Sequence, residues 1–410
     1  MRIVIVSAGA VGIQIASELV SENKDVVIIE KDPEVVRHVS NQLDCLIIND
    51  SGNKPDVLEK AGVKRADFLI SLTGSDEMNM IICGIAADIS PATTTIARIR
   101  NADYLKNKPE NDDRQDKGAS YRAAADPFVG INYMVNPDIE SSQAIIKAID
   151  HGALSDIMLF KETDLELTNL VIDERSPFRD LPIRDLRKSL NLTFLIVAVI
   201  RQDDFIIPRG ETVLQEGDIV YLFAEEDVLT KLFEYSGRGK TSINKVAIIG
   251  GGKIGVAVAQ YLLNVTGERA SFFSKIRSFL ARKSKRRVTI IERNYEKCKH
   301  LSELLPDALV LNSDITDEGF VEEEDIEDFD LIITTTDNPE LNLVTALYAK
   351  KQGVKKAIAL VNKPGYIPMG TQLGIDVVIS LKDRMANKML KFIRKGSIRN
   401  IYGIAGGKLE

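Results

Sequence analysis

Short runs of apolar, mostly β-branched residues recur along the chain and alternate with stretches of helical periodicity. In the first third they read RIVIV, VVIIE, CLIIN, FLISL, TIARI and INYMV, and in the last part KVAIIG, VTIIE, ALVLN, LIITT, AIALV and DVVIS. Apolar strands separated by helices are typical of a parallel sheet that is covered on both faces. The pattern therefore predicts two doubly wound, Rossmann-like α/β domains.

The second of these domains opens with a dinucleotide-binding pattern. Its first strand runs into GGGKIG at residues 250–255, an amphipathic stretch follows, and the next strand ends on Glu292. In this layout the glycines permit the tight turn, the approach of a pyrophosphate and close packing of helix on strand. The acid is expected to bind an adenosine ribose and to disfavour a 2′-phosphate. We predict a nucleotide site here, with the phosphates at the helix N-terminus.

The first domain repeats this pattern with a variation. SAGAVG at residues 7–12 follows the first strand, and Glu30 ends the second. Ser7 takes the place of the first glycine, whereas Gly9 and Gly12 keep the phosphate-approach and packing positions. We expect the fold to be kept and the turn geometry to be the uncertain feature of this site.

The two domains are copies of one unit with different insertions. Equivalent residues lie about 243 to 264 positions apart, as in Gly12 and Gly255, Glu30 and Glu292, Asp50 and Asp314, and Asn79 and Asn342. The increase after the glycine pattern predicts an insertion of about 20 residues in the second copy. The separation between equivalent residues falls back to 244 at Gly130 and Gly374. This decrease predicts an insertion of 18 residues in the first copy, after Tyr104.

Between the copies, the pattern changes to short strands joined by turns. The runs LELTNLVI, TFLIVAVI, DFIIP and DIVYLFA, with two helical stretches, predict a small α+β domain with an antiparallel hairpin. The predicted divisions are 1–150 for the first Rossmann-like domain, 154–236 for the small domain, 237–243 for a linker and 244–393 for the second Rossmann-like domain.

Composition narrows the function classes. A net charge of −7 disfavours a nucleic-acid binder, and no apolar run approaches the roughly 18 residues of a membrane span. We expect no signal peptide, because the first strand begins directly after Met1. Cys45, Cys83 and Cys298 are scattered among apolar residues, so we expect buried thiols rather than a metal site or a disulfide.

Candidate site residues come from the loops after the strands, because ligands of doubly wound sheets bind at the carboxyl ends of strands. In the first copy they are Ser7, Gly9, Ala10, Val11, Gly12, Glu30, Lys31, Asp50, Ser51, Thr73, Gly74, Arg98 and Arg100. In the second copy they are Gly250, Gly252, Lys253, Ile254, Gly255, Glu292, Arg293, Asp314, Ile315 and Thr336.

Simpler roles compete with ligand contact for several of these residues. Loop capping is the alternative for Asp50, Thr73, Asp314 and Thr336. Arg98 and Arg100 follow the fifth strand of the first copy, where the second copy has Leu360-Val361-Asn362. A phosphate-binding cation after that strand is therefore expected only in the first copy, and a solvated strand edge or a subunit contact is its alternative.

The insertion in the second copy is basic. Between residues 264 and 287, eight basic side chains surround apolar residues at helical spacing, which predicts a basic amphipathic helix. We favour packing of this helix on a neighbouring subunit, and peripheral membrane contact through 266–287 is the second interpretation. The other insertion, KNKPENDDRQDKGAS, is polar and predicts a mobile loop.

Several motifs together resemble a known family. TGSDEMN at 73–79, ARIR at 97–100 and GINYMVNP at 130–137 are similar to the RCK domain, the regulator of potassium conductance. The stretch 207–218, IPRGETVLQEGD, resembles the RCK C-terminal subdomain. The whole chain is similar to tandem RCK proteins of the TrkA type, which implies that 394–410 begins a second small domain and is too short to complete it.

This resemblance implies a cytoplasmic regulatory subunit, peripheral at the inner face of the cell membrane, that forms a homo-oligomeric ring. It implies binding of NAD(H) and/or ATP and ADP, and gating of a membrane-embedded Trk-type potassium transporter. The rivals are an NAD-dependent oxidoreductase and a regulator of another channel or efflux system. We do not favour an enzyme, because His151 and His300 lie away from the strand-end loops.

Overall fold

The computed structural model describes residues 1–106, 130–150, 158–159, 165–172, 174, 176–190, 192–202, 204–236, 243–263, 286–316, 326–363 and 365–394. The first insertion, nearly all of the second one, most of the linker and residues 395–410 lie outside these ranges. The polar loop, the basic helix with its membrane contact and the incomplete second small domain therefore stay predictions.

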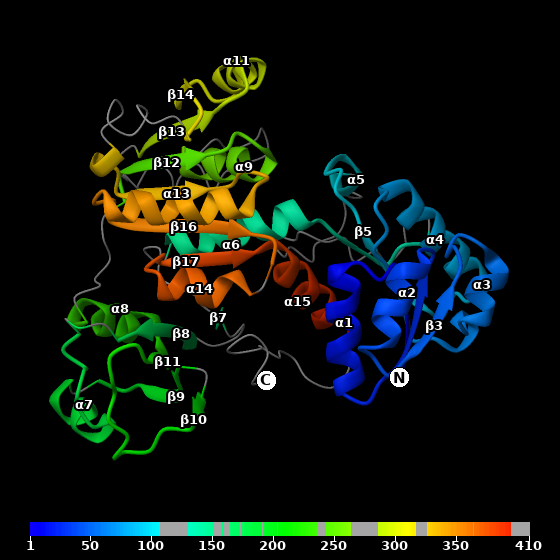
Figure 1. Ribbon diagram of the computed structural model, residues 1–410, viewed down its shortest axis with the longest axis horizontal. Coiled ribbons are helices and arrows are strands. Elements are labelled where there is room, and N and C mark those ends of the chain that lie inside the picture. Colours follow the sequence, from blue (N-terminus) through cyan, green and yellow to red (C-terminus); the bar gives the residue numbers. More distant parts are fainter. Residues whose placement is uncertain are drawn as a thin grey trace, which may run out of the picture. The chain divides into compact units, whose positions relative to one another are not determined.

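The first sheet is parallel and has the strand order β3-β2-β1-β4-β5-β6. Figure 1 labels β3 and β5 of this sheet. Its strands are β1 (Arg2–Val6), β2 (Asp25–Glu30), β3 (Leu46–Asn49), β4 (Phe68–Ser71), β5 (Thr94–Arg98) and β6 (Tyr133–Val135). The helical segments are α1 (Ala10–Ser21), α2 (Pro33–Ser40), α3 (Pro55–Lys60), η1 (Val63–Arg65), α4 (Asp76–Ile89), α5 (Asp103–Lys106) and α6 (Pro137–Asp150). Strand order reverses between β1 and β4, the usual place for a ligand.

The second parallel sheet repeats this order as β14-β13-β12-β15-β16-β17. Its strands are β12 (Lys245–Ile249), β13 (Arg287–Glu292), β14 (Leu309–Asn312), β15 (Leu331–Thr334), β16 (Lys356–Val361) and β17 (Val377–Ser380). The helical segments are α9 (Lys253–Leu262), α11 (Tyr295–Leu304), η2 (Ile326–Asp328), α13 (Pro339–Lys351), α14 (Tyr366–Gln372) and α15 (Leu381–Arg394). The predicted pair of doubly wound domains is confirmed.

Strand register corrects one pair of equivalent residues. Glu30 lies beside Asn49 in the first sheet, and Glu292 lies beside Asn312 in the second. Counting from these asparagines, the counterpart of Asp314 is Ser51. The pairing of Asp50 with Asp314 was wrong by one residue, because matching acid to acid ignored the hydrogen-bond register that aligns the strands.

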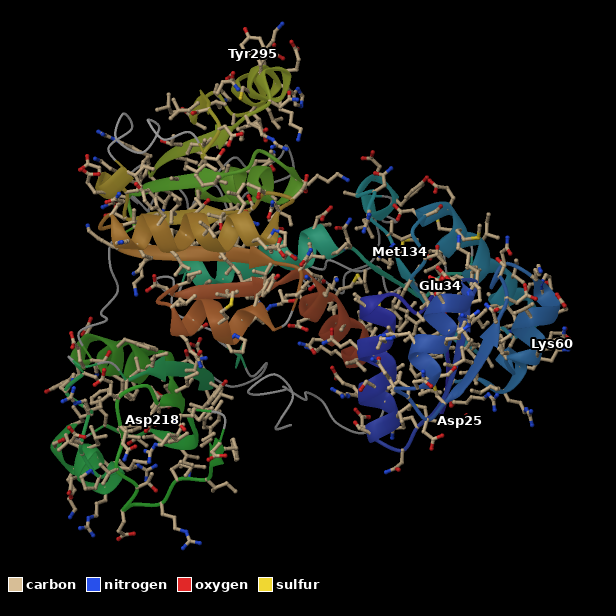
Figure 2. The ribbon with its side chains drawn as sticks, in the orientation of Figure 1. Asp25, Glu34, Lys60, Met134, Asp218 and Tyr295 are labelled. Carbon is tan, nitrogen blue, oxygen red and sulfur yellow. The ribbon has the colours of Figure 1, made fainter. Side chains whose placement is uncertain are left out.

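The small domain is a mixed α+β unit, as predicted. Its sheet has the order β10-β9-β11-β8-β7, and the pairs within it are antiparallel. Its elements are β7 (Met158–Leu159), β8 (Leu165–Val171), α7 (Ile183–Leu190), β9 (Leu195–Arg201), β10 (Asp204–Ile206), β11 (Ile219–Glu225) and α8 (Glu226–Tyr235). The fully buried carboxylate of Asp218 (Figure 2) accepts two hydrogen bonds of 2.8 Å from Arg201, which anchors the loop before β11.

Helix α15 completes the core of the first Rossmann-like domain. Of the described residues, those within Met1–Ser141 form one compact unit together with α15, and those within Ser142–Ser380 form the other. Met385, Met389 and Leu390 are buried in the same cluster as apolar residues of α1, and the ring of Phe392 stacks on Tyr133 at 4.2 Å. The sequence placed this helix in the 244–393 domain, because periodicity reveals an apolar face without its partner.

Polar contacts surround this apolar interface. The amide of Gln14 donates to Asp383 at 2.8 Å, and Arg394 forms ion pairs with Glu18 on α1 and with Glu22, the C-cap residue of that helix. These contacts align α15 along α1, the helix that begins at the first glycine turn.

Two of the cysteines are buried, and the third is half-buried. Burial raises the pKa of the Cys45, Cys83 and Cys298 thiols, so they are protonated at neutral pH. Within the ranges given above, no helix has both the length and the apolar character that a membrane crossing requires, and no group of three metal-ligating side chains is present.

Candidate nucleotide sites

The glycine turn of the second copy depends on two glycines. Gly250 has a φ of +105°, and a Cβ atom there would lie 3.0 Å from the main chain of Thr335. A Cβ atom on Gly255 would lie 2.2 Å from the carbonyl oxygen of Gly250. Neither position admits a side chain without movement of the backbone, so both glycines are needed for the turn.

Gly252 is not required by the turn itself. It is the N-cap of α9, it has extended backbone, and no side chain caps this helix. A Cβ atom at Gly252 would have no neighbour within 4 Å. The first N–H groups of α9 are therefore not covered by a cap, which is the arrangement that binds phosphate at helix N-termini.

The acid at the end of β13 ties the strand to the turn. Glu292 is 8% exposed. One carboxylate oxygen accepts a hydrogen bond of 3.0 Å from the Gly251 N–H, and the other accepts one of 2.9 Å from the Asn294 N–H. A carboxylate has about four acceptor positions, so about two remain for ribose hydroxyls.

A cavity of about 290 Å³ lies over this turn. Of the predicted residues, Gly250, Gly252, Glu292, Arg293, Asp314, Ile315 and Thr336 line it. Lys253, Ile254 and Gly255 are not among its lining residues, because they form the first turn of α9 below it. The prediction missed Ile249, Ile291, Lys297, Ser313, Thr335, Asp337, Asn338 and Leu341.

Asp314 and Thr336 also act within their own loops. The Asp314 carboxylate accepts hydrogen bonds from the N–H and the hydroxyl of Thr316, and these bonds hold its pKa below the usual value. The Thr336 hydroxyl donates to the carbonyl of Asn338 and to the side chain of Asn342. Both residues line the cavity, so loop capping and cavity lining coincide here.

The first copy builds the same turn with a serine. Ser7 has a φ of +84°, and a Cβ atom on Gly12 would lie 2.3 Å from the Ser7 carbonyl oxygen. The buried carboxylate of Glu30 accepts hydrogen bonds from the N–H groups of Ala8 at 2.7 Å and Asp32 at 3.0 Å. Ser7 thus adopts the left-handed backbone of Gly250, and the turn geometry is kept despite the substitution.

The remaining predicted residues of the first copy surround this turn. Gly9 is the uncapped N-cap of α1, and Ala10 and Val11 form the first turn of that helix. Lys31 is exposed directly after Glu30, and a Cβ atom on Gly74 would have no neighbour within 4 Å. Gly9, Ala10 and Val11 thus form the start of the helix that follows the first glycine turn.

Asp50 and Ser51 make contacts inside their own loop. The Asp50 carboxylate forms a 2.7 Å ion pair with Lys54, which is the first cause of its lowered pKa. The Ser51 hydroxyl donates to the side chain of Asn53 at 2.7 Å. These contacts match the loop-capping alternative.

A buried asparagine shapes the loop after β4 and after β15. Asn79 accepts hydrogen bonds from the N–H and the hydroxyl of Thr73, both at 2.8 Å, and donates to the Arg98 carbonyl at 2.8 Å. In the second copy, Asn342 accepts hydrogen bonds from the N–H and the hydroxyl of Thr336 and donates to the Leu360 carbonyl. The repeat offset marked both asparagines, but their positioning role was missed because it needs three-dimensional contacts.

Arg98 lies at the carboxyl end of β5. Its guanidinium donates to the Thr73 carbonyl, and its Nε is buried without a hydrogen-bond partner among the atoms that the structure describes. Desolvation is the first cause of its lowered pKa, followed by the nearby charge of Arg100. The main-chain N–H of Arg100 donates to the Asp76 carboxylate at 2.9 Å. The strand register puts Leu360 at the position of Arg98 in the second copy.

Two glycine turns, each tied to a buried glutamate at a switch point, define the class: a tandem Rossmann-fold protein with a small α+β domain between the copies. The TrkA-N domain family matches residues 3–110 and 274–381, and the TrkA-C domain family matches residues 167–237. The chain belongs to the TrkA family, whose members combine these RCK-type domains.

Curated relatives are similar over the whole chain. Proteins named Trk system potassium uptake protein TrkA from Azorhizobium caulinodans and Halomonas elongata are each 28% identical over 411 residues, covering 100% of this chain and 84% and 83% of theirs. A TrkA homolog 1 from Methanosarcina mazei is 29% identical over 416 residues, covering 100% of this chain and 93% of its own.

Solved structures share the fold. The GsuK channel bound to NAD has a TM-score of 0.58 at 19% identity, with 97% of this chain and 64% of that chain covered. The GsuK RCK domain has a TM-score of 0.59 at 20% identity, with 97% and 77% covered. GsuK bound to ADP has a TM-score of 0.53 at 16% identity, with 96% and 69% covered.

Proposed function

We propose that this chain is a regulatory subunit that binds NAD(H) and/or ATP and ADP and gates a Trk-type potassium transporter. The cavity over the second glycine turn, with the buried carboxylate of Glu292 at its edge, is the observation that carries the nucleotide part of the proposal. The names of the relatives support potassium uptake, and the NAD and ADP complexes of GsuK support the choice of ligands.

The two candidate sites suggest how binding acts on conformation. A nucleotide shifts an equilibrium only when its affinities for the two conformations differ. At the first site, α1 begins at the glycine turn, and Gln14 and Glu18 on this helix and its C-cap residue Glu22 contact α15. A phosphate at the N-terminus of α1 therefore acts on a helix that holds the end of the second copy. This supports nucleotide-dependent regulation.

Calorimetry with ATP, ADP and NADH tests nucleotide binding. Gly9→Asp and Gly252→Asp each put a carboxylate at an uncapped helix N-cap where space is open, so the fold is kept and phosphate is repelled. We expect each variant to lose one of two binding events, about 100-fold or more in affinity. Gly210→Asp, in the small domain, is the matched control, because a Cβ atom there would make only ordinary van der Waals contact, 3.5 Å from the Cβ of Arg184. Unchanged binding in both site variants would refute the nucleotide sites.

An NAD-dependent oxidoreductase remains the rival. Its chemistry requires an acid or base beside the nicotinamide. Incubation of the purified chain with NADH and candidate oxidants, followed by absorbance, separates the two functions. Binding without turnover is expected, and turnover would favour the enzyme.

The transporter partner is tested separately. We propose a cytoplasmic homo-oligomer, peripheral at the inner face of the membrane. Co-purification with a membrane-embedded Trk-type subunit is expected, and release of that subunit by a change of nucleotide would link binding to gating. Co-purification with another channel or an efflux protein instead would favour the alternative partner.

A further inference from the structure

The two sites differ at the end where a ribose would lie. In the second copy, Arg293 and Lys297 both line the cavity, beside Glu292. The corresponding residues of the first copy are Lys31 and Val35. The second site therefore has two cationic side chains at this end, and the first site has one.

Local structure explains why Lys297 reaches the cavity. Asn294 is the N-cap of α11, and its side chain accepts a hydrogen bond of 3.0 Å from the Lys297 N–H. Cys298 and Leu301 take the buried face of the helix, which leaves Lys297 on the cavity side. Tyr295 on the same turn is 67% exposed (Figure 2), so an incoming ligand finds this turn open.

The two cationic side chains at this end have few contacts with the described residues. In the part of the chain that the structure describes, neither Arg293 nor Lys297 forms a salt bridge, although Arg293 acts electrostatically on Asp314. Both oxygens of Glu292 already accept hydrogen bonds from main-chain N–H groups. An anionic group of a ligand would find two donors here besides those of the glycine turn.

We propose that the second site takes an adenine nucleotide that carries a further phosphate on its adenosine ribose, with Arg293 and Lys297 as the contacts of that phosphate. This inference rests on the proposed nucleotide binding at the second glycine turn. The rule that a strand-end acid disfavours a 2′-phosphate then holds at the first site, where Val35 stands in place of Lys297. At the second site, Arg293 and Lys297 offset the repulsion by the three carboxylates that line the same cavity, those of Glu292, Asp314 and Asp337.

Calorimetry with small probes isolates this contact. In a Gly9→Asp chain, where the first site is blocked, the probes are AMP, adenosine 2′,5′-bisphosphate and adenosine 3′,5′-bisphosphate. We expect one of the bisphosphates to bind at least as tightly as AMP, and the isomer that does so identifies the ribose position. Lys297→Val installs the first-copy residue. It should raise the dissociation constant of that bisphosphate about tenfold relative to the dissociation constant of AMP.

Further variants separate the contact from general damage. Lys297→Gln keeps the length of the side chain without its charge and should shift the ratio as Lys297→Val does. The reciprocal Val35→Lys, in a Gly252→Asp chain, should shift it toward the bisphosphate at the first site. Bisphosphates that bind at least tenfold more weakly than AMP, or a ratio unaffected by Lys297→Val, would overturn the inference while leaving the proposed function intact. Absence of all adenine nucleotide binding in the Gly9→Asp chain would overturn both.

Discussion

The two glycine turns have nearly the same backbone and different surroundings. Ser7 and Gly250 both have positive φ, and Glu30 and Glu292 make equivalent hydrogen bonds to the turn. The cations differ: the first copy has Arg98 at the end of its fifth strand, and the second has leucine there but a lysine on α11. Duplication has thus kept the parts that hold the turn and changed the charges that face a ligand.

This comparison separates residues that build the scaffold from residues that select a ligand. Scaffold residues are buried and satisfied by main-chain partners in both copies, as Asn79 and Asn342 are. The residues that we propose select a ligand lie at the edges of the turn and differ between the two copies. Equal substitutions in both copies test the first group, and exchanges between copies test the second.

The largest effect is expected for the buried asparagines. Asn79→Ala and Asn342→Ala each leave several polar groups of two loops unpaired, at 0% and 1% exposure, and each should cost about 3 kcal/mol of unfolding free energy. Denaturant unfolding measures this cost. Asn53→Ala, at an exposed position, is the control and should cost less than about 0.5 kcal/mol. Very different costs in the two copies would refute equivalence of the scaffolds.

Exchange of the turn residues comes next. Gly250→Ser forces a Cβ atom to 3.0 Å from the main chain of Thr335 and should cost about 2 kcal/mol. Ser7→Gly relieves the left-handed strain of a serine, partly offset by the greater freedom of the unfolded chain, and should stabilise by about 0.5 kcal/mol. Thermal unfolding measures both. Destabilisation by Ser7→Gly would mean that the serine side chain itself supports the turn.

Removal of the first-copy cation should weaken one site only. Arg98→Leu installs the residue of the second copy and removes the buried guanidinium at the end of β5. In a Gly252→Asp chain, we expect ATP to bind about tenfold more weakly, or about 1.4 kcal/mol. Calorimetry measures the ATP affinity. Arg65→Leu, at an exposed position, is the control. Equal ATP affinity in both variants would assign Arg98 to the fold alone.

The smallest effect concerns Asp314, whose counterpart in the first copy is Ser51. The hydrogen bonds from Thr316 lower the pKa of Asp314 in the folded protein, so they stabilise it above the unfolded pKa of about 3.9. This contribution is lost as pH falls through the folded pKa. Thr316→Val keeps the N–H donor and removes the hydroxyl donor, so it should raise the pKa of Asp314 part of the way and reduce this pH dependence, which carbon NMR titration detects. An unchanged pKa would assign the shift to other groups.

Much of the fold and about half of the residues that line the second-copy cavity could be predicted because the relevant signals are local. A glycine with positive φ, a strand of apolar residues and an acid at its end occupy fixed positions in one βαβ unit, so their spacing predicts the turn around Gly250 and the place of Glu292 beside it. The hydrogen bond by which Glu292 holds the turn, from the Gly251 N–H, was not predicted. Lys297 lies four residues after Arg293, on helix α11, and this spacing was a signal in the sequence. Only the cavity shows that both side chains face the same space.

The sequence alone determined two Rossmann-like copies, their glycine turns and the small domain between them. Tertiary structure decided which residues are equivalent across the sheets, which loop groups the asparagines satisfy, and that α15 packs on α1. The physical reason is the range of the interactions. Periodicity and turn chemistry report the environment of a residue along its own element, whereas hydrogen-bond register and the partner of an apolar face depend on elements far away in the chain.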